Sequence, residues 1–195
     1  MYLQQWLSTA QKLTPNTQKG SALLNVFGKS LEWIYSKEYR GGCHDTSAAI
    51  YILLSELGLS PVLCIGEVQH DHLFFDHSWI ELNNKIYDAA VCMPNVEGVP
   101  SSPVFASKDL TTNQDTELIY GVASPTGYDE AARTILHMTL GEYSNFHSDD
   151  PNKVWNLAKT LGKEAGMKVN VGKIRDKHSH IKRLERHEPI SARAL

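Results

Sequence analysis

The chain has 195 residues, of which 42% are apolar and 21% charged, and a formal net charge of −3 with its nine histidines neutral. This is ordinary globular composition, and the length suits one domain, or one domain with an extension, that buries a core without disulfides or metals. The charge argues against a nucleic-acid-binding protein, whose surface would be basic, so no nucleic-acid partner is expected.

The three cysteines, Cys43, Cys64 and Cys92, are too few and too widely spaced for a disulfide framework or a thiolate zinc site. The first residues lack the basic start and apolar run of a signal peptide, and no stretch has the apolar length needed to span a bilayer. We therefore expect a soluble cytoplasmic protein with no membrane partner and with free thiols.

Three helices are predicted in the first third of the chain. Apolar residues recur at helical spacing over residues 2–13 and again over 21–37, with turn-forming residues between them at 14–17. Residues 43–57 are apolar almost all round, which is typical of a buried helix, and Gly58 stands where helices commonly end.

Strands follow the third helix. Residues 62–68 form a short apolar run, and two further strand-like runs, 73–82 and 85–91, flank the pair Asn83-Asn84. Asparagine tolerates positive φ, so this pair predicts a tight two-residue hairpin.

The second half of the chain is more polar. Residues 94–116 are rich in Pro, Ser, Thr and Asn and read as a long surface excursion, while 128–141 and 151–165 are candidate helices. The tail 173–188 is polar and mostly basic, a composition more often found on a solvated helix face or a frayed terminus than in an anion-binding segment.

This order of elements predicts an α+β fold, in which helices and strands are segregated along the chain. We expect a core with its N-terminal helices over residues 1–125. A helical C-terminal extension is expected over residues 126–195, either separate from the core or part of the same domain.

Cys43 opens the most apolar helix directly after Gly41-Gly42. A helix N-terminus stabilises the thiolate, which is the reactive form of cysteine, and its free N–H groups can hold an oxyanion. Glycines permit a tight turn and close approach of a substrate. A packing role remains the alternative for Cys43, and it is the preferred interpretation for Cys64 and Cys92.

The predicted hairpin selects partners for this cysteine. With a loop at 83–84, Trp79 lies opposite Asp88, and His77 becomes a diagonal neighbour of Asp88 on the same face of the sheet. Asp76 adjoins His77 in sequence but points to the other face. A nucleophilic cysteine needs a base, and the base needs an orienting group, which predicts a catalytic triad of Cys43, His77 and Asp88.

Three further residues are weaker candidates for binding substrate or lining the site, namely Gly42, His44 and Trp79. Asp45 follows the cysteine as well, where an acidic residue favours a helix start, so capping is its expected role.

The segments GGCHDTSAAIYILLSELGLSPVLCIGEV and FDHSWIELNNKIYDAA resemble the core of transglutaminase-like and papain-like cysteine enzymes. The resemblance spans about residues 30–92. It includes a cysteine that opens a small, apolar helix, a His-x-Trp-x-Glu strand beginning at His77, and a closing acid at Tyr87-Asp88.

This resemblance implies a papain-like α+β core, with the cysteine helix packed on a small antiparallel sheet that supplies His and Asp. It implies acyl transfer through a thioester without metal or organic cofactor, on a peptide or a small amide or acyl substrate. Hydrolysis by a peptidase or amidase is the first expectation, and transfer of the acyl group to an amine is the second. The side chain that completes the oxyanion hole is not identified, with Trp33, Tyr39 and Gln18 as candidates.

Two interpretations of another class remain open. The segment containing His70, Asp71, His72, Asp76 and His77 is dense enough in imidazole and carboxylate groups for a divalent metal, although a solvated loop is the simpler interpretation. The domain could also be a non-catalytic interaction module, against which the presence of all three triad residues argues.

Overall fold

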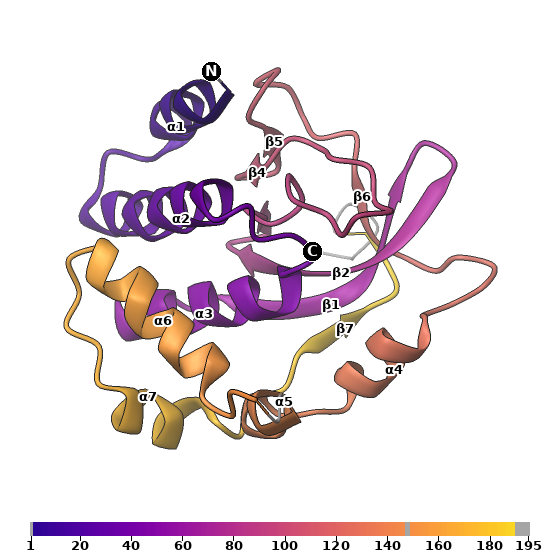
Figure 1. Ribbon diagram of the computed structural model, residues 1–195. Coiled ribbons are helices and arrows are strands. Elements are labelled where there is room, and N and C mark those ends of the chain that lie inside the picture. The colour runs from indigo at the N-terminus through magenta and orange to yellow at the C-terminus, as the bar shows by residue number, and fades with distance from the viewer. Residues whose placement is uncertain (1, 147–148, 190–195) are drawn as a thin grey trace.

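The computed structural model describes residues 2–146 and 149–189 of the chain, and it has the α+β architecture that the sequence predicts. These residues contain seven helices and a curled sheet, and the helices lie to the left of the sheet and below it in Figure 1. The helices are α1 Tyr2–Leu13, α2 Gln18–Ser36, α3 Cys43–Glu56, α4 Glu130–Leu136, α5 Leu140–Phe146, α6 Lys153–Glu164 and α7 Val171–His178.

The first three helices lie where the sequence predicts them. The break at 14–17 is present, and α2 begins three residues earlier than expected because the Thr17 side chain accepts a hydrogen bond from the backbone N–H of Gly20. Helix α3 begins at Cys43, and the chain leaves it through Gly58, whose φ of 71° is left-handed.

The main sheet is mostly antiparallel, with the order β3-β2-β1-β6 and with β7 pairing in parallel with β1. Its strands are β1 Val62–His70, β2 Leu73–Leu82, β3 Lys85–Tyr87, β6 Ile119–Val122 and β7 Leu184–Arg186. Strand β1 is central because β6 pairs with its C-terminal half and β7 with its N-terminal half.

The predicted hairpin register between β2 and β3 is confirmed. Leu82 pairs with Lys85, and the two loop residues Asn83 and Asn84 have φ values of 52° and 56°. The strand expected over 85–91 is shorter than predicted, because the ladder ends at Tyr87.

The carboxylate of Asp88 accounts for this early end. Its Oδ1 accepts hydrogen bonds from the backbone N–H groups of Ala90 and Val91, at 3.0 and 3.1 Å. Such a side-chain turn diverts the chain from the ladder. Trp79 and Asp88 are therefore not a ladder pair, although the faces assigned to β2 are correct.

The expected surface excursion over 94–116 contains structure that the sequence did not reveal. It includes a second, two-stranded sheet of β4 Val104–Phe105 and β5 Lys108–Asp109, and the side chains of Val104, Phe105 and Leu110 are fully buried. Strand β6 was also not predicted.

The C-terminal part, for which a helical extension is expected, contains four helices and also the strand β7 in its described residues. The predicted helix over 151–165 is confirmed as α6, but the one over 128–141 is two short helices, α4 and α5. The tail forms α7 and then β7, which enters the main sheet beside β1. Residues 126–189 therefore complete the core formed by the first 125 residues.

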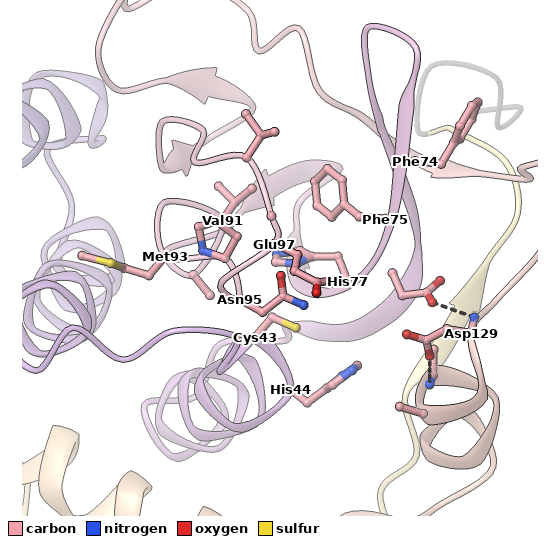
Figure 2. A pocket seen from close by; sticks show the side chains of 18 of the residues that line it. Cys43, His44, Phe74, Phe75, His77, Val91, Met93, Asn95, Glu97 and Asp129 are labelled. Atoms are coloured by element: carbon pink, nitrogen blue, oxygen red, sulfur yellow. Dashed lines mark hydrogen bonds between the residues drawn. The ribbon is translucent and has the colours of Figure 1, made fainter.

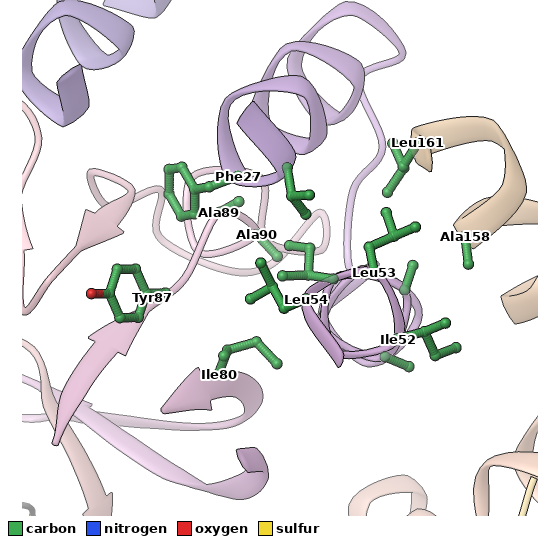
Figure 3. Packing of buried hydrophobic residues seen from close by; sticks show 14 of the residues in the cluster. Phe27, Ile52, Leu53, Leu54, Ile80, Tyr87, Ala89, Ala90, Ala158 and Leu161 are labelled. Atoms are coloured by element: carbon green, nitrogen blue, oxygen red, sulfur yellow. The ribbon is translucent and has the colours of Figure 1, made fainter. Parts of the chain in front are cut away.

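Helix α3 is buried from several sides, which explains its apolar character. It packs against β2 and β1 on one side and against α2 and α6 on the others (Figure 1). In Figure 3, Leu54 of α3 points toward Ile80 of β2, whereas Leu53 points toward Leu161 of α6. No helix in residues 2–146 and 149–189 combines the length and apolar character needed to cross a membrane.

The opposite face of the sheet carries a second, smaller apolar cluster. It includes Cys64 and Val68 of β1, Trp79 of β2 and Tyr120 of β6, with the Trp79 and Tyr120 rings 5.1 Å apart between centroids. The sheet is thus covered on both faces, and β2 presents apolar residues to each.

The left-handed turn at Asn83-Asn84 yields a stability prediction. Replacing Asn84 by valine places a β-branched residue at φ 56° and should cost roughly 1–2 kcal/mol of unfolding free energy, measured by urea denaturation. The matched variant Asn84→Gly should be at least as stable as the wild type, because glycine adopts this φ without strain. Equal stability of both variants would contradict the role given to this turn.

Candidate active site

A cavity of about 440 Å³ opens beside the start of α3. Cys43 and His44 line it from α3, His77 from β2, Asn95 and Glu97 from the loop that follows β3, and residues of α4 close it on another side (Figure 2). The volume lies in the usual range for ligand-binding sites. Residues from four separate segments therefore line the cavity that contains Cys43.

Cys43 is the only one of the three cysteines with a partly exposed side chain. Burial raises the pKa of both the Cys64 and the Cys92 thiols to about 12, so these two remain protonated packing residues as predicted. The residue before α3, Gly42, makes no side-chain cap hydrogen bond. The start of α3, beside Cys43, therefore lacks a side-chain cap from Gly42, and uncapped helix starts are favourable positions for an anion.

His77 and Asp88 form a buried pair. The Nε2 atom of His77 lies 2.7 Å from Oδ2 of Asp88, and both side chains are almost inaccessible to solvent. The Tyr120 hydroxyl donates to the same Oδ2 at 2.8 Å. Since Asp88 Oδ1 accepts the two backbone N–H groups described above, the carboxylate has four donors and a fixed orientation.

The protonation of His77 follows from its neighbours. Burial lowers the pKa of this imidazole, but the negative charges of Asp88 and Cys43 and the hydrogen bonds to both outweigh burial and raise it to about 10. With Nε2 engaged by Asp88, Nδ1 is the ring nitrogen left for the cysteine. The arrangement favours an imidazolium between a carboxylate and a sulfur.

His44 lines the cavity, as expected, and is held neutral. Its Nδ1 lies 2.6 Å from the Ser78 hydroxyl. Burial, followed by the positive charges of Arg183 and His77, lowers the pKa of His44 to about 3. His44 thus adds hydrogen-bonding capacity to the site without adding charge.

Arg183 is a residue of this region that the sequence did not indicate. It lies in the basic tail that was interpreted as solvated, yet only 4% of its surface is exposed. Its Nη2 donates to the backbone carbonyl of His44 at 3.2 Å, and its guanidinium lies 4.4 Å from the centroid of the Tyr143 ring. The tail therefore fixes the residue that follows the candidate nucleophile.

Asp45 anchors α3 to its surroundings through its side chain. It accepts hydrogen bonds from the hydroxyls of Tyr39 at 2.5 Å and Tyr143 at 2.8 Å, and it forms an ion pair with Lys153 of α6 at 2.8 Å. The expectation that it caps the helix therefore gives way to a role in fixing the first turn of α3 against α6 and α5.

Two of the weaker candidates lie outside the cavity lining. The Cα of Gly42 is in close contact with the Tyr39 ring, since a Cβ at this position would lie 2.1 Å from Cε1 of Tyr39. Trp79 is fully buried in the second apolar cluster, where its Nε1 donates to Glu81. Both residues support the site through packing, and Gly41 rather than Gly42 lines the cavity.

The histidine-rich segment between β1 and β2 does not converge. His70 contacts the hydroxyl of Ser101, Asp76 accepts the backbone N–H of Asp129, and His77 is bonded to Asp88. Within residues 2–146 and 149–189, no three His, Cys, Asp or Glu side chains form a group suited to a metal ion.

None of the three side chains considered for the oxyanion hole lines the cavity. Tyr39 is bonded to Asp45, the Trp33 ring packs at a tilt against Tyr39 with ring centroids 4.9 Å apart, and Gln18 begins α2. In contrast, the Asn95 side chain lines the same cavity as Cys43 (Figure 2).

Comparison of the chain with known protein families, curated proteins and solved structures finds no match.

The raised pKa of His77 predicts a pH-dependent stability. Its folded-state pKa of about 10 exceeds the ordinary value of 6.5, so the imidazolium contributes stability that is fully present below pH 6.5 and is lost as the pH rises toward 10. The difference in unfolding free energy between the wild type and His77→Gln, measured in urea, should shrink by up to about 1.4 kcal/mol per pH unit in this window. A difference that grows with pH would contradict the protonated pair.

Proposed function

We propose that the protein is a cysteine-dependent peptidase or amidase that acts through a thioester on Cys43. One observation carries the proposal: a partly exposed cysteine at a helix start lines the same cavity as an imidazole whose other nitrogen is fixed by a buried carboxylate. These are the components of a nucleophile, a base and an orienting group. The resemblance of residues 30–92 to transglutaminase-like and papain-like enzymes suggests the same chemistry.

In the proposed mechanism, the proton of the Cys43 thiol already resides on His77 before substrate binds, so that a thiolate faces an imidazolium. The thiolate then attacks the carbonyl carbon of an amide, and the resulting tetrahedral oxyanion collapses as the C–N bond breaks. His77 returns the proton to the leaving amine, which leaves an acyl thioester on Cys43. Water, activated by His77, hydrolyses the thioester. Asp88 holds the imidazole tautomer and stabilises its positive charge throughout.

The developing oxyanion requires hydrogen-bond donors. We assign this role to backbone N–H groups at the start of α3, together with the side-chain amide of Asn95, which lines the cavity beside Cys43. Asn95 belongs to the loop after β3, so this donor would come from downstream of the nucleophile in the chain.

An amine can resolve the same thioester in place of water, which would make the protein an acyltransferase. The two outcomes share every step up to the acyl-enzyme. Acylation of Cys43 therefore tests the proposal, and the product formed with and without added amines then distinguishes hydrolysis from transfer.

We expect p-nitrophenyl acetate to acetylate Cys43, with release of p-nitrophenol and a mass increase of one acetyl group. The variant Cys43→Ala should abolish the labelling. Asp88→Asn should slow it by roughly 10²–10⁴-fold, because the imidazole loses its orienting anion. Stopped-flow absorbance and intact-mass spectrometry provide the measurements.

A matched control is available in Cys64→Ala and Cys92→Ser. These thiols are buried with high pKa values, so both variants should retain labelling at Cys43. Labelling spread evenly over the three cysteines, or unaffected by Asp88→Asn in a folded protein, would refute the catalytic role and favour a non-catalytic module.

A further inference from the structure

The edge of β2 that faces away from β1 is only partly covered. Strand β3 pairs with it from Ile80 to Leu82 and then ends. From Leu73 to Trp79, no strand in the described residues pairs with this edge. An uncovered strand edge presents unpaired N–H and C=O groups, which can accept a further strand.

Two hairpins establish which residues present these groups. In a two-residue hairpin the residues that flank the loop form a hydrogen-bonded pair, and such pairs alternate along the ladder. Because Leu82 pairs with Lys85, the backbone N–H and C=O groups of every second residue of β2, from Leu82 down to Phe74, point away from β1. Because His70 pairs with Leu73, the backbone N–H and C=O groups of the intervening residues of β2 point toward β1. Both hairpins therefore assign outward-facing backbone groups to Phe74, Asp76 and Ser78.

The cavity follows this edge. Successive residues of a strand point to opposite faces, so a cavity on one face is lined by every second residue. The cavity beside Cys43 is instead lined by five consecutive residues of β2, from Leu73 to His77. It therefore runs along the edge of the strand and ends at the candidate base.

The character of the lining suits a polypeptide chain. The rim is apolar and exposed at Leu73, Phe74 and Val99, whose exposed fractions are 44%, 39% and 54%. Single exposed apolar residues are common, but here they gather at the mouth of one cavity.

Apart from the histidines, the charged side chains of the described residues that line the cavity are all acidic. They come from Asp76, Glu97 and Asp129, and no lysine or arginine of residues 2–146 and 149–189 lines the cavity. One carboxylate oxygen of Asp76 is buried and has no hydrogen-bond partner within the described residues. A basic side chain complements such a lining, whereas an acidic one is repelled by it.

We propose that the substrate is an extended peptide with a basic side chain, which docks as an added strand on the outer edge of β2 at Phe74–Asp76 and so brings a backbone carbonyl to Cys43. This rests on the proposed function. Main-chain hydrogen bonds to the edge supply affinity, and the alternating side chains of the peptide reach the apolar rim and the carboxylates. Asn95 and Glu97, from the loop after β3, line the same cavity.

The test begins with the wild-type protein and a mixture of peptides from digested, denatured proteins. Mass spectrometry identifies the peptides that are cleaved, and one of them is then synthesised with a single N-methyl group at each backbone position in turn. Only every second N–H of an added strand faces its neighbour. We expect cleavage to fall at least tenfold at alternate positions.

Two protein variants isolate the contribution of the edge. Phe74→Ala removes the ring, and Phe74→Pro also removes the outward N–H, a change that strand edges tolerate. The ratio of peptide cleavage to acetylation by p-nitrophenyl acetate should be at least tenfold lower in Phe74→Pro than in Phe74→Ala. Lys and Arg should be enriched in the cleaved peptides, and Asp76→Asn should reduce this enrichment.

The outcomes separate the two proposals. If p-nitrophenyl acetate labels Cys43 but no peptide is cleaved, or N-methylation has no alternating effect, the strand-docking proposal is wrong while the thioester chemistry stands. Cleaved peptides without enrichment of Lys and Arg would overturn the basic preference. If Cys43 is not labelled at all, the proposed function fails first.

Discussion

The site depends on the four hydrogen bonds accepted by the Asp88 carboxylate. Two come from backbone N–H groups and end the β3 ladder, one comes from His77 and fixes the imidazole, and one comes from Tyr120 on β6. A buried carboxylate is costly unless it is fully bonded, so these partners must be present together. One side chain thereby terminates a strand, orients the candidate base and links the hairpin to β6.

Local patterns were sufficient to predict the hairpin and the contact between His77 and Asp88. The pair Asn83-Asn84 defined the register, and register in a strand determines which side chains share a face. The same pattern overestimated the length of β3, because it could not reveal that the Asp88 carboxylate would bond to the backbone ahead of it. The predicted contact is correct although the predicted ladder pair is not.

Non-local contacts were beyond the reach of the sequence patterns. Tyr120 lies in a four-residue strand, and its bond to Asp88 joins positions 32 residues apart. Arg183 lies in a segment whose composition is polar, and only tertiary packing buries it against Tyr143. A basic, non-periodic segment predicts solvent exposure, and the burial of one of its charges depends on partners distant in the chain. The same reasoning explains why β6 and β7 were missed.

The surroundings of α3 show why the two halves of the chain form one functional unit. A buried guanidinium requires compensation, and Arg183 receives part of it from the Tyr143 ring and the carbonyl of His44, while its Nε and Nη1 have no hydrogen-bond partner within the described residues. Tyr143 in turn donates to Asp45, which is also neutralised by Lys153. Apart from the contact between Arg183 and Tyr143, each of these contacts joins the first turn of α3 to a residue beyond position 140. The orientation of Cys43 is therefore determined as much by the C-terminal third of the chain as by the segment in which its signature lies.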